Sequence, residues 1–329
     1  MRIVRGQRNR GPGTHAHRGE RNHGAGASAD EKVGVMRAYR SDRSGEFGHI
    51  GWEYHDPGEF LLRAAAYVAD GLNLDQRVGY VGADDPATMR AALAAAGLGK
   101  DAREVHVKTV TEHFLFQGEV VDAERMTERY AAAAVAAVAD GYSGLRIVID
   151  VTPVVRTPAQ RDAQAALEFL GDRRISTLPV AVMCGYNATE LGDAAAGLLC
   201  LHPAAGPSSV PFQLYAQPAG RNAIALAGTL DAASEPLFLT TLQRVLPLLS
   251  HDTLEIDARE LEFVGHRQLC LLDRYCAAHG RTALLRSDRA IVHRLVDLLE
   301  FGNVRIEETA SGVLIGFGQA GEARCRRER

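Results

Sequence analysis

The segment LEIDARELEFVGHRQLCLLDRYCAAH, residues 254–279, predicts a buried strand, a tight turn and a helix. Apolar residues from Leu254 to Val264 are typical of a buried strand, whereas Leu269 and Leu272 recur at helical spacing. The four residues Gly265 to Gln268 form the predicted turn. A turn that opens a helix presents free backbone N–H groups and the positive end of the helix dipole. We therefore expect this turn to favour an anion or a phosphate group.

The C-terminal third resembles the STAS family, the domain of anti-sigma-factor antagonists and of the cytoplasmic tails of sulfate transporters. GTLDAAS, residues 228–234, resembles the Gly-x-Leu-Asp turn before the first helix of that family, and residues 254–265 resemble its central strand. The resemblance covers residues 207–318. It implies a small α/β domain whose partner is an anti-sigma factor or a related kinase-like protein.

In switchable STAS domains the turn is Asp-Ser-Ser-Gly, and its first serine is phosphorylated by the partner. This chain has His266 at that position, so the usual serine switch is not expected. His266 could replace the switch, because imidazole changes charge near neutral pH, or the turn could be a docking surface without a switch. The resemblance implies the following partner-binding residues: Asp231, Gly265, His266, Arg267, Gln268 and Leu269. Asp231 could instead cap the helix that starts near Ser234.

Composition indicates a soluble protein of two domains. The chain has 329 residues, of which 46% are hydrophobic and 24% charged, and its formal charge of -4 argues against a nucleic-acid-binding protein. Residues 1–45 are rich in Gly, Arg and His, and we expect a disordered basic tail. We also expect a basic tail at residues 319–329. Met36 is an alternative translation start.

The predicted location is the cytoplasm. The five cysteines form no CxxC pair, which fits a reducing compartment better than a disulfide framework. The sequence has neither a signal peptide nor an apolar run long enough to span a membrane. Membrane binding is therefore not expected.

Residues 46–205 predict an α/β domain with a parallel sheet. Asp56-Pro57, Asp85-Pro86 and Thr157-Pro158 each place a capping acceptor before a proline, which is typical of a helix start. Short apolar runs alternate with these helices and predict strands. These runs are residues 78–81, 105–107, 145–149 and 179–183. Ala204 to Ser209 predicts a linker to the second domain.

Motifs in this first domain resemble the MEDS sensory domain. They are HIGWEY at 49–54, GLRIVIDVT at 144–152, VAVMCGYN at 180–187 and Leu201-His202-Pro203. That family is expected to sense small hydrocarbon derivatives and is related to RecA and KaiC folds. The resemblance implies these ligand-binding residues: His49, Tyr54, Asp150, Cys184 and Tyr186. Asn187 stands where the family commonly has Asp.

Other chemistries remain as alternatives. His49, Cys184 and His202 could converge on a metal, or they could be a hydrogen-bonded histidine and a buried cysteine. Nucleophilic catalysis by Cys184 would need a base and an orienting group, for which the sequence gives no local signal. The nearest approach to a phosphate loop, Gly97 to Asp101, follows a helix and lacks the required hydroxyl. We predict no enzyme activity, no metal and no cofactor.

These expectations combine into one functional hypothesis. The first domain senses a small molecule, and the second domain binds a protein partner in a way that depends on this ligand. The protein would then act as a relative of anti-sigma-factor antagonists. The alternatives are a nucleotide-dependent enzyme built on the RecA-like half and a constitutive binding scaffold.

Overall fold

The computed structural model describes residues 47–206, 210–217 and 223–307. The tails predicted at 1–45 and 319–329 lie outside these residues. The predicted α/β class is confirmed. Within the described ranges the first sheet has six parallel strands in the order β3-β2-β6-β7-β1-β8. Their bounds are β1 Gly48–Tyr54, β2 Arg77–Gly82, β3 His106–Thr109, β6 Leu145–Asp150, β7 Val180–Asn187 and β8 Ala204–Gly206.

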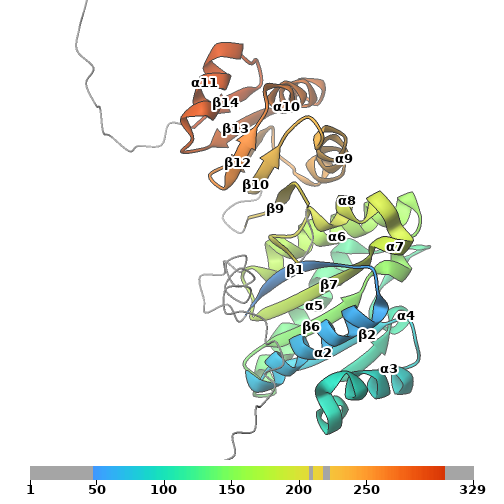
Figure 1. Cartoon of the computed structure of the whole chain (residues 1–329). Helices are drawn as coiled ribbons and strands as arrows, with labels where there is room; N and C mark the ends of the chain where they lie inside the picture. The colour runs from blue at the N-terminus through green and yellow to red at the C-terminus, as the bar shows by residue number, and fades with distance from the viewer. Residues whose placement is uncertain (1–46, 207–209, 218–222, 308–329) are drawn as a thin grey trace, which may run out of the picture.

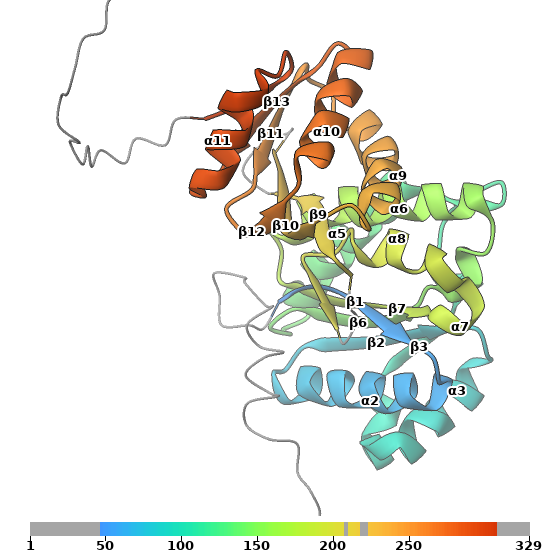
Figure 2. The same ribbon diagram turned by 45° about the horizontal axis from the view of Figure 1, so that its top comes forward.

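Helices cover both faces of this sheet (Figure 2). One face packs on α2 Pro57–Asn73 and α3 Pro86–Leu93, and the other on α5 Ala123–Ala139 and α6 Pro158–Ile175. The shorter elements are α4 Val110–His113, α7 Ala188–Leu191, α8 Ala196–Leu199 and the hairpin of β4 Phe116–Gln117 and β5 Val120–Val121. This layered arrangement follows from strands that alternate with helices in the sequence.

The three predicted helix starts are confirmed by their capping contacts. The Asp56 carboxylate accepts a hydrogen bond from the backbone N–H of Gly58 at 2.7 Å. Asp85 accepts from the third helical residue, Thr88, at 3.1 Å. Thr157 and Gln160 form a reciprocal capping box. Each cap satisfies N–H groups that the helix itself leaves free.

The second domain contains a mixed sheet covered by helices (Figure 1). Its described strands run in the order β12-β10-β11-β13-β14, and β9 pairs antiparallel with β10. The strands are β9 Phe212–Ala216, β10 Ala223–Leu230, β11 Thr253–Asp257, β12 Leu261–Val264, β13 Thr282–Arg286 and β14 Val304–Ile306. The helices are α9 Glu235–Val245, α10 His266–Ala278 and α11 Ala290–Leu299.

The single strand predicted across Leu254 to Val264 is wrong, because the structure has two strands there. β11 and β12 pair with different parts of β10 and lie on opposite sides of it. The Asp257 carboxylate accepts a hydrogen bond from the backbone N–H of Arg259 at 3.2 Å, which closes a turn after β11. The predicted turn before the helix is also shorter than expected: Gly265 is the N-cap, and α10 begins at His266.

The predicted linker is partly wrong as well. Ala204 pairs with Ile50 of β1, so residues 204–206 are a strand of the first sheet. The two domains also pack on each other, and one apolar core contains residues from both. The Arg244 guanidinium of α9 donates to the Asp162 carboxylate of α6 at 2.8 Å, and Leu214 donates its N–H to the carbonyl of Cys200 at 2.7 Å.

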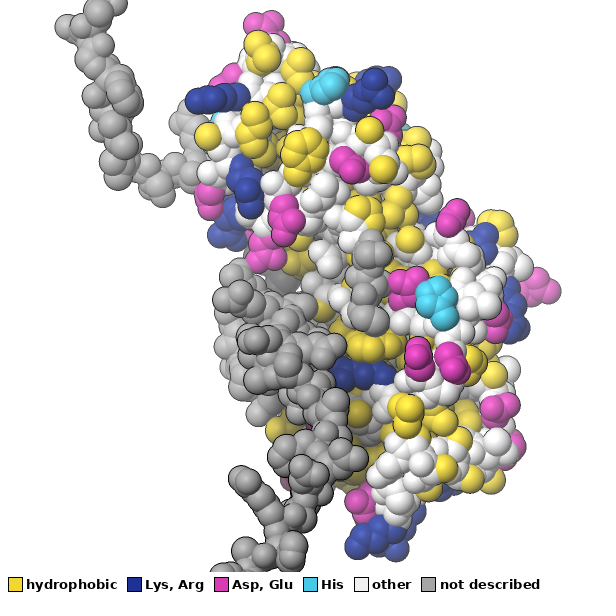
Figure 3. Space-filling model, in the orientation of Figure 1, with side chains coloured by type: hydrophobic (Ala, Val, Ile, Leu, Met, Phe, Trp, Pro, Cys, Tyr) yellow, Lys and Arg dark blue, Asp and Glu magenta, His cyan; other side chains and the backbone are white. Residues whose placement is uncertain are grey.

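The last helix, α11, packs on the sheet with only part of its apolar surface. Val292 and Val296 are buried, whereas Leu298 is 77% exposed and Ile291 is 53% exposed. Figure 3 shows hydrophobic side chains lying among charged ones over the second domain on the face drawn there. Among the described residues, none of the helices combines the length and the apolar composition that a membrane-spanning segment needs.

Close packing of β7 against α2 gives a test of the fold. A Cβ atom added at Gly185 would lie 2.3 Å from the ring of Phe60, so Gly185→Ala must displace that ring. We expect it to lower the free energy of unfolding by about 1–3 kcal/mol. The matched control is Gly79→Ala in β2, where the nearest atom would lie at an ordinary 3.5 Å. Urea denaturation of both variants measures the difference, and equal stability would contradict this packing.

Candidate functional site

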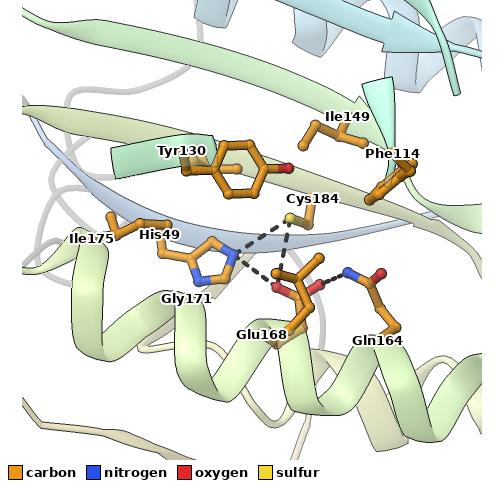
Figure 4. Close-up of a pocket in the computed structure, with 11 residues that line it drawn as sticks. His49, Phe114, Tyr130, Ile149, Gln164, Glu168, Gly171, Ile175 and Cys184 are labelled. Atoms are coloured by element: carbon orange, nitrogen blue, oxygen red, sulfur yellow. Dashed lines mark hydrogen bonds and ion pairs between the residues drawn. The ribbon is translucent and has the colours of Figure 1, made fainter. Parts of the chain in front are cut away.

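A cluster of buried polar side chains lies between the first sheet and α6 (Figure 4). It consists of His49 from β1, Cys184 and Tyr186 from β7, Glu168 from α6 and His202, which follows α8. All five side chains are buried: their residues are at most 5% exposed. We call this group the Glu168 cluster, because each of the other side chains contacts the Glu168 carboxylate directly.

Local structure explains why these side chains converge. Alternate residues of a strand point to the same face of a sheet, so Cys184 and Tyr186 share the face that packs on α6. His49 lies on that face of β1, as does Gly51 two residues later. A Cβ at Gly51 would lie 3.0 Å from the His202 ring, so glycine gives the imidazole room to approach the sheet.

The helix supplies its polar groups at helical spacing. Gln164, Glu168 and Asp172 are four residues apart along α6 and therefore share one face of it. Gln164 donates to Glu168 Oε1 at 2.6 Å, and Tyr186 also donates its hydroxyl to that oxygen. Glu168 Oε2 is directed at the histidines and the cysteine.

The atoms around Glu168 Oε2 are close to one another. His49 Nε2 lies 3.1 Å from this oxygen and His202 Nε2 lies 3.5 Å from it. Cys184 Sγ is 3.4 Å from His49 Nε2 and 3.9 Å from Glu168 Oε2. Four groups that can each donate an electron pair to a metal therefore present atoms within 4.8 Å of one another.

A contact at Nδ1, the ring nitrogen that faces away from Glu168, orients each histidine. His49 Nδ1 lies 2.6 Å from the Asp172 carboxylate, and His202 Nδ1 lies 3.1 Å from the carbonyl oxygen of Leu198. A carbonyl oxygen only accepts, so Nδ1 of His202 carries the hydrogen and Nε2 presents a lone pair when the ring is neutral. Among the described residues that Nε2 finds no hydrogen-bond partner.

Burial and neighbouring charges shift the pKa values of the cluster. Burial raises the pKa of Glu168, but His202, His49 and Tyr186 outweigh it and lower this pKa to about 2. Burial lowers the pKa of His49, yet Asp172 and Cys184 raise it well above its ordinary value. Burial and the charge of His49 lower the pKa of His202 to about 4. These neighbours therefore favour the ionised form of the Glu168 carboxylate.

The space beside the cluster is small. The cavity lined by His49, Glu168 and Cys184 has a volume of about 10 Å³, which is close to what one water molecule needs. Apolar and aromatic side chains complete its wall, including Phe114, Tyr130 and Ile149 (Figure 4). In this conformation the cavity is far smaller than a typical pocket for an organic ligand.

The five predicted ligand-binding residues lie in two places. His49, Cys184 and Tyr186 belong to the Glu168 cluster, whereas Tyr54 and Asp150 meet on the opposite face of the sheet, beside α2. There the Tyr54 hydroxyl donates to the Asp150 carboxylate at 3.0 Å. Burial and this carboxylate raise the pKa of Tyr54. The structure therefore does not bring all five residues into one site.

The predicted partner-binding residues of the second domain divide by exposure. His266 and Arg267 are exposed in the first turn of α10, but Gln268 and Leu269 are buried. Gln268 donates its amide to the backbone carbonyl of Asp231 at 2.7 Å, so the two predicted turns do lie together. The Asp231 carboxylate accepts from the N–H of Ser234 at 2.9 Å, in the turn before α9; the N-cap of α9 is Ser234, and no side chain caps this helix start, so the predicted capping role of Asp231 is not observed.

Sequence reasoning missed Glu168 and Asp172. A signal for them was present in the sequence. The buried face of an amphipathic helix is usually apolar, but Glu168 and Asp172 lie four residues apart on the same side of α6 as the buried Ala165 and Phe169. From the sequence, a metal held by His49, Cys184 and His202 was only an alternative and no metal was predicted; the structure brings these three side chains together.

The cluster can be compared with two kinds of chemistry. Cys184, His49 and Asp172 stand in the order of a nucleophile, a base and an orienting acid. However, burial and the Glu168 charge raise the pKa of the Cys184 thiol to about 12, the opposite of an activated thiolate. A set of two imidazoles, a thiol and a carboxylate is also one that zinc binds.

A buried histidine that contacts the cavity wall predicts that the stability of the protein depends on pH. His113 contacts the Tyr130 hydroxyl at 2.9 Å, and burial lowers its pKa from 6.5 to about 3. The unfolded chain therefore takes up a proton at His113 below about pH 6.5, while the folded chain does not. Acidification from about pH 7 to pH 5 should cost about 2 kcal/mol through this residue. Urea denaturation at both pH values should show that His113→Asn removes this part of the pH dependence. An unchanged dependence would contradict the buried neutral imidazole.

Comparison with known proteins identifies the first domain. Residues 48–203 match the family described as MEDS: MEthanogen/methylotroph, DcmR Sensory domain. The match extends from β1 through α8 and includes every residue of the Glu168 cluster. No match to a STAS family covers the second domain, and no curated protein matches the chain. Residues 48–203 are thus a MEDS sensory domain, which implies a sensory or signalling role.

Proposed function

We propose that the chain is a signalling regulator in which the MEDS domain senses a small ligand and the second, STAS-like domain binds a protein partner. The partner is an anti-sigma factor or a related kinase-like protein, and the chain acts as an antagonist of it without the usual phosphorylatable serine. One observation carries this proposal: the segments that build the Glu168 cluster also form the contact with the second domain.

The first of these segments is α6. Its polar face holds Glu168 and Asp172 in the cluster, while Asp162 near its start pairs with Arg244 of α9 at 2.8 Å. The second domain packs on this helix through α9 and β9. A ligand that moved Glu168 by repacking α6 would therefore change the surface on which the second domain packs.

The second segment runs through the end of α8. His202 points into the Glu168 cluster, and Cys200, two residues before it, contacts the Thr241 hydroxyl of α9 at 3.4 Å. The guanidinium of Arg244 also donates to the carbonyl of Gly197 in α8 at 3.3 Å. Two separate segments thus connect the interior of the MEDS domain to the same helix of the second domain.

The proposed output surface is the start of α10. His266 and Arg267 are exposed there, and the neighbouring Phe263 is 52% exposed. A cationic helix start with an adjacent aromatic ring favours an acidic partner surface. The absence of a hydroxyl in the turn Gly265 to Gln268 supports binding without control by serine phosphorylation.

An enzyme that hydrolyses nucleotides is less well supported. Only two residues, His55 and Asp56, connect β1 to α2. This connection is too short for a loop that wraps phosphates. Gly97 to Asp101 spans the junction of two short helical segments, Ala94–Leu98 and Gly99–Glu104, and does not follow a strand. Turnover of ATP by the full chain, abolished by a substitution in the MEDS domain, would favour the enzyme.

The partner assignment is tested by capture from host lysate with the full chain as bait. Arg267→Glu reverses the charge at the proposed surface, and we expect it to weaken binding of a kinase-like anti-sigma factor about tenfold, or about 1.4 kcal/mol. The matched control is Arg294→Glu, a charge reversal at another exposed arginine, on α11. If no bait recovers such a protein, the anti-sigma-factor assignment is wrong. If both variants recover it equally, the start of α10 is not the surface that binds it.

A further inference from the structure

The centre of the Glu168 cluster has the geometry of a metal site. We propose that His49 Nε2, Glu168 Oε2, Cys184 Sγ and His202 Nε2 bind one Zn²⁺ ion. The proposal concerns the MEDS domain alone and does not depend on the partner assigned to the second domain.

The separations between the donor atoms are close to those of a tetrahedral zinc site. Nitrogen and oxygen ligands lie about 2.0–2.2 Å from zinc and sulfur about 2.3 Å, so pairs of ligand atoms in a tetrahedron are about 3.3–3.6 Å apart. The observed separations are 3.1 Å for His49 to Glu168, 3.4 Å for His49 to Cys184, 3.5 Å for His202 to Glu168 and a longer 3.9 Å for Cys184 to Glu168. All donor atoms of the four groups lie within 4.8 Å of one another. Small rotations of the side chains would complete the coordination.

The surrounding hydrogen bonds orient each ligand toward this point. Asp172 and the Leu198 carbonyl hold the outer nitrogens of His49 and His202, so both Nε2 atoms face inward. Tyr186 and Gln164 donate to Glu168 Oε1, so Oε2 is the oxygen that faces the two histidines and Cys184. Zinc-bound histidines characteristically donate their other ring N–H to a carboxylate or a backbone carbonyl in this way.

The unpaired His202 Nε2 atom indicates that the cluster holds an ion and is not a complete hydrogen-bond network. His202 Nε2 is buried and finds no hydrogen-bond partner in the described part of the chain, although a carboxylate oxygen lies 3.5 Å away. A bare nitrogen lone pair facing a carboxylate oxygen in the interior is unfavourable. A cation between the two atoms removes this conflict. The small neighbouring cavity is lined by three of the four ligands.

The number of protein ligands indicates what the ion does. Zinc sites with four protein ligands are characteristically structural, whereas catalytic sites keep a position open for water or substrate. The ion would join β1, β7, α6 and the residues after α8. Because α6 and α8 also contact the second domain, loss of the ion would loosen the interdomain contact as well as the cluster.

The test measures metal bound by the full chain. After equilibration with Zn²⁺ and gel filtration, plasma mass spectrometry should find about one zinc per chain. Co²⁺ in its place should give the thiolate-to-cobalt charge-transfer band and the visible spectrum of a tetrahedral site. Zinc should also raise the midpoint of thermal unfolding, because it binds the folded state.

Two cysteine variants separate the site from adventitious binding. Cys184→Ser should weaken zinc binding at least about 100-fold and abolish the charge-transfer band. Cys200→Ser is the matched control, since Cys200 is equally buried but contacts Thr241 instead of the cluster, and it should keep both. Circular dichroism establishes that each variant is folded. Full retention of the band in Cys184→Ser would overturn the proposal.

A positioning residue gives a second and milder variant. Asp172→Asn keeps the shape of the side chain but removes the carboxylate behind His49, and it should weaken zinc binding about 10- to 100-fold while leaving the cobalt spectrum tetrahedral. Wild-type protein that binds neither zinc nor cobalt would overturn the proposal. Rapid alkylation of Cys184 by iodoacetamide in zinc-treated wild type would do so too, and would favour a free thiol acting as a nucleophile.

Discussion

The carboxylate of Glu168 is a charge placed in the interior of the first domain, and the surrounding segments are arranged to pair it with polar groups. An ionised group removed from water costs several kcal/mol unless it is paired and hydrogen-bonded. Here two imidazoles, a phenol, an amide and a thiol from four segments surround its two oxygens. Each of these groups is itself buried, so removing any one of them leaves another without a partner.

This constraint also fixes the backbone around the cluster. A Cβ at Gly51 would lie 3.0 Å from the His202 ring and from Leu199, so a side chain there would have to displace them. The helix α6 holds Glu168 and Asp172 on the face toward β1 and β7. The helix that holds the carboxylate is also the one on which the second domain packs. The charge in the interior and the interdomain contact are therefore supported by the same rigid element.

The period of a β-strand decides which predicted residues can act together. His49 and Tyr54 lie five positions apart in β1, and an odd separation places side chains on opposite faces of a sheet. His49 faces α6 in the Glu168 cluster, while Tyr54 stacks on Phe60 of α2 with ring centres 4.5 Å apart. The MEDS domain thus has a closed polar cluster on one face and the Tyr54–Asp150 pair at the strand ends on the other.

The sequence by itself determined the α/β class, the three proline-capped helix starts and the presence of a MEDS domain, because caps, strand runs and family motifs are local in the chain. Local pattern did not separate β11 from β12, since the apolar residues of both strands follow one another without a glycine or proline between them. Nor did it reveal Glu168 as the centre of the site. His49 and Cys184 are 135 residues apart, and Asp172 is 123 residues from the imidazole that it orients. Only the packing of α6 against β1 and β7 brings these side chains within hydrogen-bonding distance, because the free energy that holds a buried charge comes from contacts between segments and not from any one of them.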